Sequence, residues 1–273
     1  MNPWTGARRI EEVEKILLPK GAGRCELSVM KTVSRLILFV CAWLAAAQIV
    51  TAQTSAWASD YNRLLGKYVT SSGVKYGAWK GNAADMQALQ GVVDAVAKEN
   101  VSALGQKEQL AFYVNAYNAW ILHEALAKYP TASVKDALYT FFTSKRIKVA
   151  GQQTSFKALE DETIRARFGE PRIHFALNCA SRSCPTLNSE PFTASKLDAQ
   201  FEKLAKNYVN ADKGVRLSAD GKRAELSQIF EWSKDDFKNG GPLEFINKRR
   251  SKPIPKDAKI SYQKYDWSLN EAK

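Results

Sequence analysis

The fold is decided by one stretch, Lys107-Glu-Gln-Leu-Ala-Phe-Tyr-Val-Asn-Ala-Tyr-Asn-Ala-Trp-Ile-Leu-His-Glu-Ala-Leu-Ala-Lys128. Its apolar residues lie on nearly every side of a helix, which is typical of a helix enclosed by the rest of the protein. Pro130 follows two residues later, and proline lacks the N–H that would extend the helix. We therefore predict a central, buried helix over residues 107–128.

The segments around this helix predict a mixture of helices and strands. Apolar spacing and start signals predict further helices over residues 61–68, 85–98, 156–168 and 191–210. Strands are predicted over residues 141–149 and over Arg172–Leu177, where apolar residues alternate with others. This order predicts an α+β fold: a single compact domain with a central buried helix and a small sheet.

The N-terminal part of the chain has the pattern of a secretory signal peptide. A short basic start at Met30–Arg35 precedes the apolar run Leu36–Ala47, and Val50-Thr-Ala52 offers small residues for cleavage. The run is shorter than the roughly 20 residues that a spanning helix needs, although an uncleaved anchor is an alternative. We predict a signal peptide over residues 30–52 and a periplasmic or secreted protein. Residues 1–29 are then expected to be a gene-model extension.

Basic residues outnumber acidic ones throughout the chain. Forty Lys and Arg stand against 28 Asp and Glu, giving a net charge of +12 at pH 7, and the excess persists after residue 52. Such a charge favours an anionic partner, such as an envelope polymer or lipid headgroups. The densest basic cluster, Lys248–Lys252, lacks the interleaved aromatic residues of a nucleic-acid groove. We expect an envelope or other anionic ligand, no nucleic acid, and no transmembrane segment after signal removal.

Candidate chemistry gathers in Arg172-Ile-His-Phe-Ala-Leu-Asn-Cys-Ala-Ser-Arg-Ser-Cys-Pro185. Cys179 and Cys184 are the only cysteines after residue 52. His174 lies on the predicted strand, five residues before Cys179, so a continued strand would place the two on opposite faces. His174 and Cys179 can meet only if the chain turns at Asn178. Otherwise the partner of His174 comes from elsewhere in the chain.

Three hypotheses fit these residues. In the first, Cys179 is a nucleophile, His174 its base and Asn118 the amide that orients the imidazole, as in thiol-dependent hydrolases and acyl transferases. In the second, Cys179 and Cys184 form a structural disulfide, which an oxidising compartment permits. In the third, Cys179, Cys184, His174 and His123 bind zinc, although no closely spaced histidine pair supports it. The first is our leading hypothesis, so we predict no metal and no cofactor.

Two further pairs have alternative interpretations. Asn115 and Asn118 share one face of the predicted helix, and buried amides need hydrogen-bond partners. They would either tie the helix to neighbouring backbone or orient a catalytic imidazole. Asp161 and Arg165, four residues apart, would form an ion pair, or the carboxylate would serve a site.

Four ordered segments resemble the family of domain of unknown function 547. They are Phe112-Tyr-Val-Asn-Ala-Tyr-Asn-Ala119, Arg172–Pro185 as quoted above, Leu226-Ser-Gln-Ile-Phe-Glu-Trp-Ser-Lys-Asp-Asp-Phe237 and Tyr265-Asp-Trp-Ser-Leu-Asn270. The resemblance predicts one domain of this family over residues 57–270, but it implies no reaction, because the family is named for its unknown function. The chain has Ala180 where the family often has Gly, and Thr186 where a second Pro is usual.

Overall fold

The structure, a computed structural model, describes residues 57–135, 138–238 and 240–273, leaving out the side chains of 138 and 139. These residues fall within one compact unit, Ala56–Lys273. The predicted signal peptide at 30–52 and the segment 1–29 lie outside the described residues. Within the described residues, no helix combines the length and the hydropathy that crossing a membrane requires.

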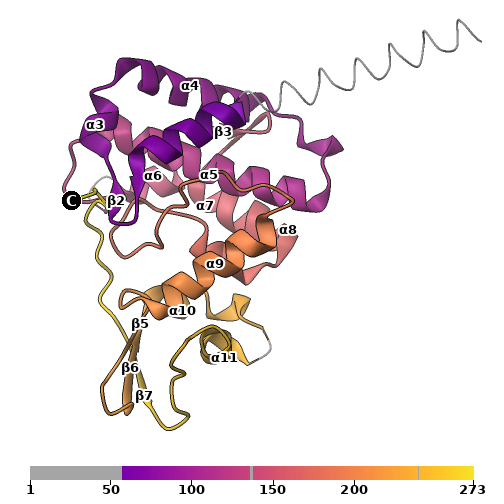
Figure 1. The fold of residues 1–273 in the computed structure, drawn as a ribbon. Coiled ribbons are helices and arrows are strands. Elements are labelled where there is room, and N and C mark those ends of the chain that lie inside the picture. The colour runs from indigo at the N-terminus through magenta and orange to yellow at the C-terminus, as the bar shows by residue number, and fades with distance from the viewer. Residues whose placement is uncertain (1–56, 136–137, 239) are drawn as a thin grey trace, which may run out of the picture. The chain divides into compact units, whose positions relative to one another are not determined.

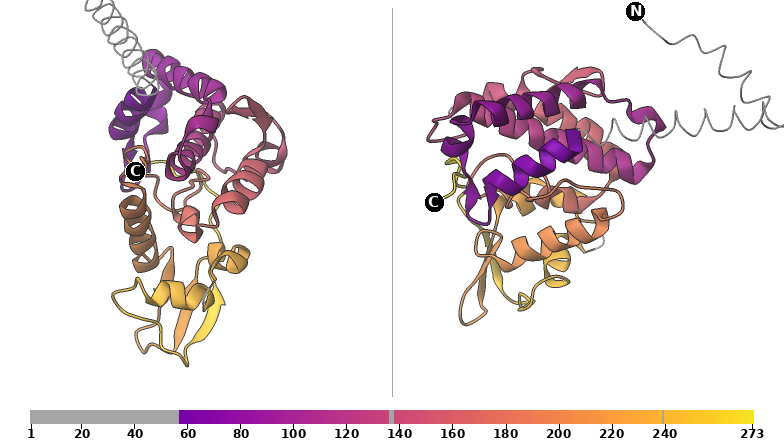
Figure 2. Two further views of the ribbon diagram at one scale, coloured as in Figure 1. Left: turned by 90° about the vertical axis from the view of Figure 1, so that its right-hand side faces the viewer. Right: turned by 45° about the horizontal axis from the view of Figure 1, so that its top comes forward.

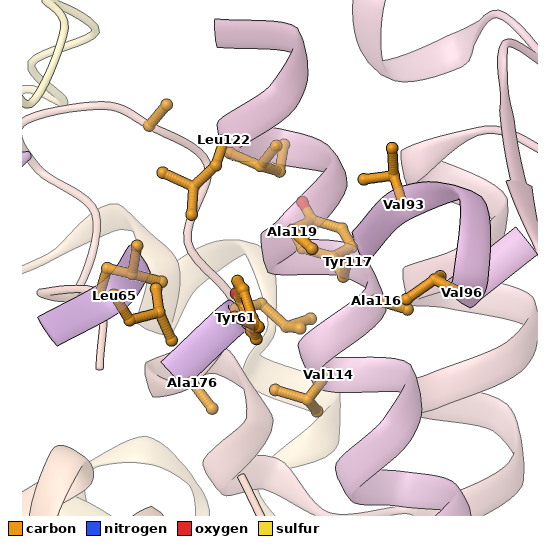
Figure 3. Packing of buried hydrophobic residues seen from close by; sticks show 14 of the residues in the cluster. Tyr61, Leu65, Val93, Val96, Val114, Ala116, Tyr117, Ala119, Leu122 and Ala176 are labelled. Atoms are coloured by element: carbon orange, nitrogen blue, oxygen red, sulfur yellow. The ribbon is translucent and has the colours of Figure 1, made fainter. Parts of the chain in front are cut away.

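Helix α5 (Gln106–Lys128) is the predicted central helix, and the structure confirms it. Glu108 in its first turn accepts a hydrogen bond from the Gly105 N–H at 2.7 Å, which satisfies one backbone donor at the helix start. Neighbouring elements enclose α5 on several sides. Figure 3 shows Val93 and Val96 on one side of it and Tyr61 and Leu65 on the other.

The other helices and strands surround α5 or follow it. Residues 57–68 are helical. Then come α3 (Tyr76–Lys80), α4 (Ala83–Lys98), η1 (Val101–Ala103), α6 (Leu138–Thr143), α7 (Phe156–Ala158), η2 (Leu159–Arg165), α8 (Ala166–Phe168), η3 (Pro171–Phe175), α9 (Leu197–Asn210), α10 (Gln228–Trp232), η4 (Lys234–Asp236) and α11 (Gly241–Asn247). Two-stranded sheets form from β1 (Val69–Thr70) with β2 (Gly73–Val74) and from β3 (Ile147–Val149) with β4 (Gln152–Thr154).

A three-stranded sheet completes the fold. Strand β6 (Arg223–Leu226) pairs antiparallel with β5 (Val215–Leu217) and parallel with β7 (Lys259–Tyr262). In Figures 1 and 2 this sheet and α11 lie together at one end of the unit, and α3 and α4 lie at the other. The predicted α+β class is therefore confirmed, with three small sheets in place of one.

The strand predicted over Arg172–Leu177 is wrong, because the chain forms the 3-10 helix η3 there. Pro171 suits the first turn of a helix, and the Glu170 carboxylate accepts the Arg172 N–H at 3.0 Å, which caps it. Alternation also fails as a guide since Ile173, His174 and Phe175 are all buried.

Two other segments differ from the prediction. The strand predicted over 141–149 forms only at its end, because residues 141–143 belong to helix α6, where Phe141 stacks on Phe156 with ring centroids 5.0 Å apart. This packing outweighs the local preference of its residues, so that only β3 remains extended. Helix α9 begins at Leu197 rather than near residue 193, and no side chain caps it.

Segment 173–177 lies between two hydrophobic cores. Ile173 and Leu177 pack into the first core, which surrounds α5. Phe175 packs into the second core, with Tyr208 of α9 and Phe230 of α10. The segment that carries His174 and leads to Cys179 is thus fixed from both sides.

We predict that Leu122→Ala in α5 lowers the free energy of unfolding by about 2–5 kcal/mol, because it leaves a cavity in the first core. Leu243→Ala is the matched control, since Leu243 is 39% exposed, and should cost less than about 1 kcal/mol. Urea unfolding followed by circular dichroism measures both. Equal losses would contradict the central place of α5.

Candidate functional site

Three asparagines hold the loop that contains the cysteines. The Asn118 amide donates to the Ala176 carbonyl at 2.9 Å and accepts the Asn178 N–H at 2.9 Å. The Asn178 side chain accepts the Ala180 N–H at 2.8 Å and donates to the Pro185 carbonyl at 2.7 Å. Asn270 donates its own N–H to the Ala180 carbonyl at 2.9 Å. All these groups are polar and buried, so the loop has one hydrogen-bonded arrangement.

The chain turns sharply after Asn178 and brings the two thiols together. Ala180 has a φ of +61°, in the left-handed region that favours glycine. The sulfurs of Cys179 and Cys184 lie 2.7 Å apart and are not joined by a disulfide. The Cys184 sulfur also accepts the Cys179 N–H at 2.9 Å. Cys184 is buried, whereas Cys179 is partly exposed.

Further hydrogen-bond donors surround the Cys179 sulfur. The Ser181 hydroxyl lies at 3.0 Å and the Tyr265 hydroxyl at 3.4 Å. Burial alone would raise the pKa of Cys179, but hydrogen bonds from Cys184, Ser181 and Tyr265 outweigh it and lower this pKa to about 7. Burial and the neighbouring Cys179 raise the pKa of Cys184. Near neutral pH, Cys179 is therefore partly ionised, and Cys184 is the thiol that donates to its thiolate form.

Cys179 opens into a cavity of about 370 Å³. The π-helical segment η2 contributes Glu160, Asp161 and Arg165, and π-helical turns often occur at functional sites. The aromatic residues Tyr265, Trp267 and Trp232 also line the cavity, and Trp232 remains 52% exposed. Other lining residues are Tyr117, Phe142, Lys157, His174, Leu177, Cys184, Ile229 and Ser233.

His174 forms an acid–base pair with Asp236 at this cavity. Its Nε2 lies 2.6 Å from the Asp236 carboxylate, and Arg165 donates to both oxygens of that carboxylate at 2.7 and 3.1 Å. These two partners hold the pKa of Asp236 well below its usual range. In the tautomer that donates its Nε2 proton to the ionised Asp236, Nδ1 is an acceptor beside the Ser233 hydroxyl at 3.4 Å, and Glu160 lies 3.9 Å from it.

Glu160 and Asp161 are adjacent in sequence but differ in their acidity. Burial raises the pKa of Glu160, whose remaining exposed surface faces the cavity. Burial opposes ionisation of Asp161 as well, but hydrogen bonds from Lys157 and Arg165 lower its pKa below the usual value. One carboxyl group is thus suited to donate a proton and the other to stay ionised, a division that acid–base sites use.

Of the three predicted site residues, the structure places two at the cavity and one outside it. Cys179 and His174 line the same cavity, but the hydrogen bonds of His174 go to Asp236 and Ser233 and those of Cys179 to other groups. Asn118 does not line the cavity, since both ends of its amide bond to the backbone of the loop. Asp236, rather than Asn118, orients the imidazole.

Sequence reasoning missed Asp236, Ser233 and Tyr265 as site residues. Their signal was present in two of the four quoted segments, Leu226–Phe237 and Tyr265–Asn270. Asp161 and Arg165 form the predicted ion pair, at 2.6 Å, and both also line the cavity.

The structure does not bring the four predicted zinc ligands together. His123 bonds to Gln90 of α4 at 2.9 Å and does not line the cavity of Cys179. Among the residues that the structure describes, no group of three or more His, Cys, Asp and Glu side chains is arranged to hold a metal ion.

Comparison with protein families gives one match. Residues 101–209 match the family described as "Protein of unknown function, DUF547". Residues 101–209 are therefore assigned to this family. The match contains α5, η2, His174 and both cysteines, whereas Asp236 and Tyr265 lie beyond it. No curated protein and no solved structure matches the chain.

We predict that Asn118→Ala exposes the thiol loop as well as lowering stability. The variant leaves the Ala176 carbonyl and the Asn178 N–H without partners, which should cost about 2–4 kcal/mol of unfolding free energy. Asn115→Ala is the matched control, because Asn115 makes the same two kinds of bond to Phe192. Only Asn118→Ala should make buried Cys184 accessible to iodoacetamide under native conditions, as measured by peptide mass. Equal protection of Cys184 in both variants would contradict the role of Asn118.

Proposed function

We propose that this protein is an exported, thiol-dependent hydrolase or acyl transferase that acts on an envelope-associated substrate. One observation carries the proposal: an activated, partly exposed Cys179 shares a cavity with an oriented His174–Asp236 pair. Thiolates attack acyl groups, and an imidazole held by a carboxylate transfers protons. Export rests on the signal peptide predicted over residues 30–52, and the substrate location follows from it.

In the proposed reaction the Cys179 thiolate attacks an acyl carbon, and a thioester forms as the bond to the leaving group breaks. Glu160, whose pKa burial raises, supplies the proton that the leaving group takes. Nδ1 of His174 then accepts a proton from water or another acceptor alcohol, whose oxygen attacks the thioester. The acyl group is transferred to the acceptor oxygen and the Cys179 thiolate is released; the imidazolium then returns its proton to Glu160, 3.9 Å from Nδ1. Asp236 stays ionised and stabilises the imidazolium that forms transiently.

A second function has its own supporting observation. The contact of 2.7 Å between the two sulfurs is close to the roughly 2.0 Å of a disulfide. Oxidation in the periplasm would join them with a small movement. The protein would then be a non-catalytic envelope binding domain in which the Cys179–Cys184 bond stabilises the loop.

We predict that iodoacetamide alkylates Cys179 alone, with a rate midpoint near pH 7. Cys184→Ala removes the strongest hydrogen bond to the thiolate and should move this midpoint up by about one pH unit. Cys184→Ser is the matched control, because its hydroxyl can still donate, and should stay near pH 7. Stopped alkylation followed by mass spectrometry measures the rates.

The same experiment separates the two functions. Protein purified from the periplasm without reductant is alkylated before any reduction, and its intact mass is recorded. A mass lower by two hydrogens with no alkylation identifies the disulfide and rejects the thiol enzyme. Alkylation of one thiol that is lost in Cys179→Ser supports the thiol enzyme.

We also predict that Asp236→Asn lowers the turnover of an activated acyl ester, such as p-nitrophenyl acetate, by about 10²-fold or more. The alkylation midpoint of Cys179 should not change, because His174 and Asp236 do not bond to the thiol. His174→Gln should behave in the same way, and melting curves of both variants check folding. A parallel upward shift of the alkylation midpoint would instead make His174 the direct base of Cys179.

A further inference from the structure

A second cavity lies next to the cysteine loop and differs in charge from the cavity of Cys179. Its volume is about 340 Å³, within the range of small-molecule sites. Phe175, Leu187, Leu204 and Tyr208 supply apolar surface, and Lys203 and Lys213 supply positive charge. None of its lining residues is Asp or Glu, although the chain contains 28 of them. The cavity of Cys179, in contrast, contains Glu160 and Asp161.

Lys213 is the central cation of this second cavity. Its ammonium group donates to the Cys184 carbonyl at 2.8 Å and to the Thr186 hydroxyl oxygen at 3.1 Å. An ammonium group has three N–H donors, so one remains for a ligand. Neither Lys213 nor Lys203 forms an ion pair with a carboxylate in the part of the chain that the structure describes. Burial lowers the pKa of Lys213, as expected for an ammonium group that lacks a compensating negative charge.

A smaller neighbouring pocket has the same character. It shares Thr70, Ser71, Thr186 and Lys213 with the second cavity, adds Arg182, and again has no acidic lining residue. Hydroxyl groups and cations therefore line this surface together. Lys213 and Arg182 are partly buried and Lys203 is exposed. Cations without carboxylate partners, beside hydroxyl and amide donors, are the chemistry that recognises an oxyanion.

We propose that the second cavity binds an oxyanion, a phosphate or carboxylate group, through Lys213, Lys203 and Thr186. The cavity is larger than a bare ion requires, because one water occupies about 30 Å³ of liquid. The remaining space, next to Phe175 and Leu204, accommodates an apolar part of the same ligand. The Thr186 hydroxyl oxygen accepts from Lys213, so its own proton can be donated to a ligand in the cavity.

Titration of the purified protein with inorganic phosphate tests the proposal, with acetate as the carboxylate probe and chloride keeping ionic strength constant. Calorimetry should show saturable binding of at least one probe at about millimolar concentration. Lys213→Met removes the charge at similar length and should weaken binding by about tenfold or more. Thr186→Val keeps the shape without the hydroxyl and should weaken it several-fold. Whichever probe binds identifies the recognised oxyanion.

Two controls make the outcome specific. Lys259→Met changes an exposed lysine of β7 outside both cavities and should leave binding unchanged. Cys179→Ser should still bind the probe saturably, which separates this site from the proposed thiol chemistry. Absence of saturable binding for both probes, or equal binding by folded Lys213→Met and the unaltered protein, would overturn the proposal.

Discussion

The two hydrogen bonds of Asn118 are the constraint on which the site depends. They join the buried helix α5 to the backbone of residues 176–178, between His174 and Cys179. A buried amide with both ends bonded to backbone allows one position of the loop, because any other leaves polar groups without partners. Every group that acts on Cys179 is placed relative to this anchored segment.

Anchoring produces a site with two separate electrostatic environments. Cys179 is stabilised as a thiolate by short-range donors: Cys184, Ser181 and Tyr265. His174 is oriented by its hydrogen bond to Asp236, and Arg165 keeps that carboxylate ionised. Because the imidazole is not needed to activate the thiol, it is free to move protons for other groups in the cavity. In the proposed reaction, Cys179 and His174 would therefore act independently until a substrate connects them.

The sequence predicted what depends on local pattern and missed what depends on packing. Helix α5 was predictable because its residues are apolar on all sides and Pro130 follows. Segment 172–177 was misread as a strand, since two cores enclose it and periodicity carries no information when every face is buried. Asp236 lies 62 residues after His174, and no local spacing could connect them. Cys179 and Cys184 were recognisable as a pair, but their unequal acidity arises from the folded loop, where Cys184 and Ser181 donate to Cys179, and burial and Cys179 raise the pKa of Cys184.

Cys184 links the two cavities through different atoms. Its thiol donates to the Cys179 thiolate, while its carbonyl accepts a hydrogen bond from Lys213. Negative charge on either sulfur raises the pKa of Lys213 in opposition to the larger effect of burial, so ammonium and thiolate stabilise each other. A bound oxyanion would neutralise Lys213 and weaken that support for the thiolate. If the second cavity binds an oxyanion as proposed, its occupancy would raise the pKa of Cys179 without any change in the shape of the loop.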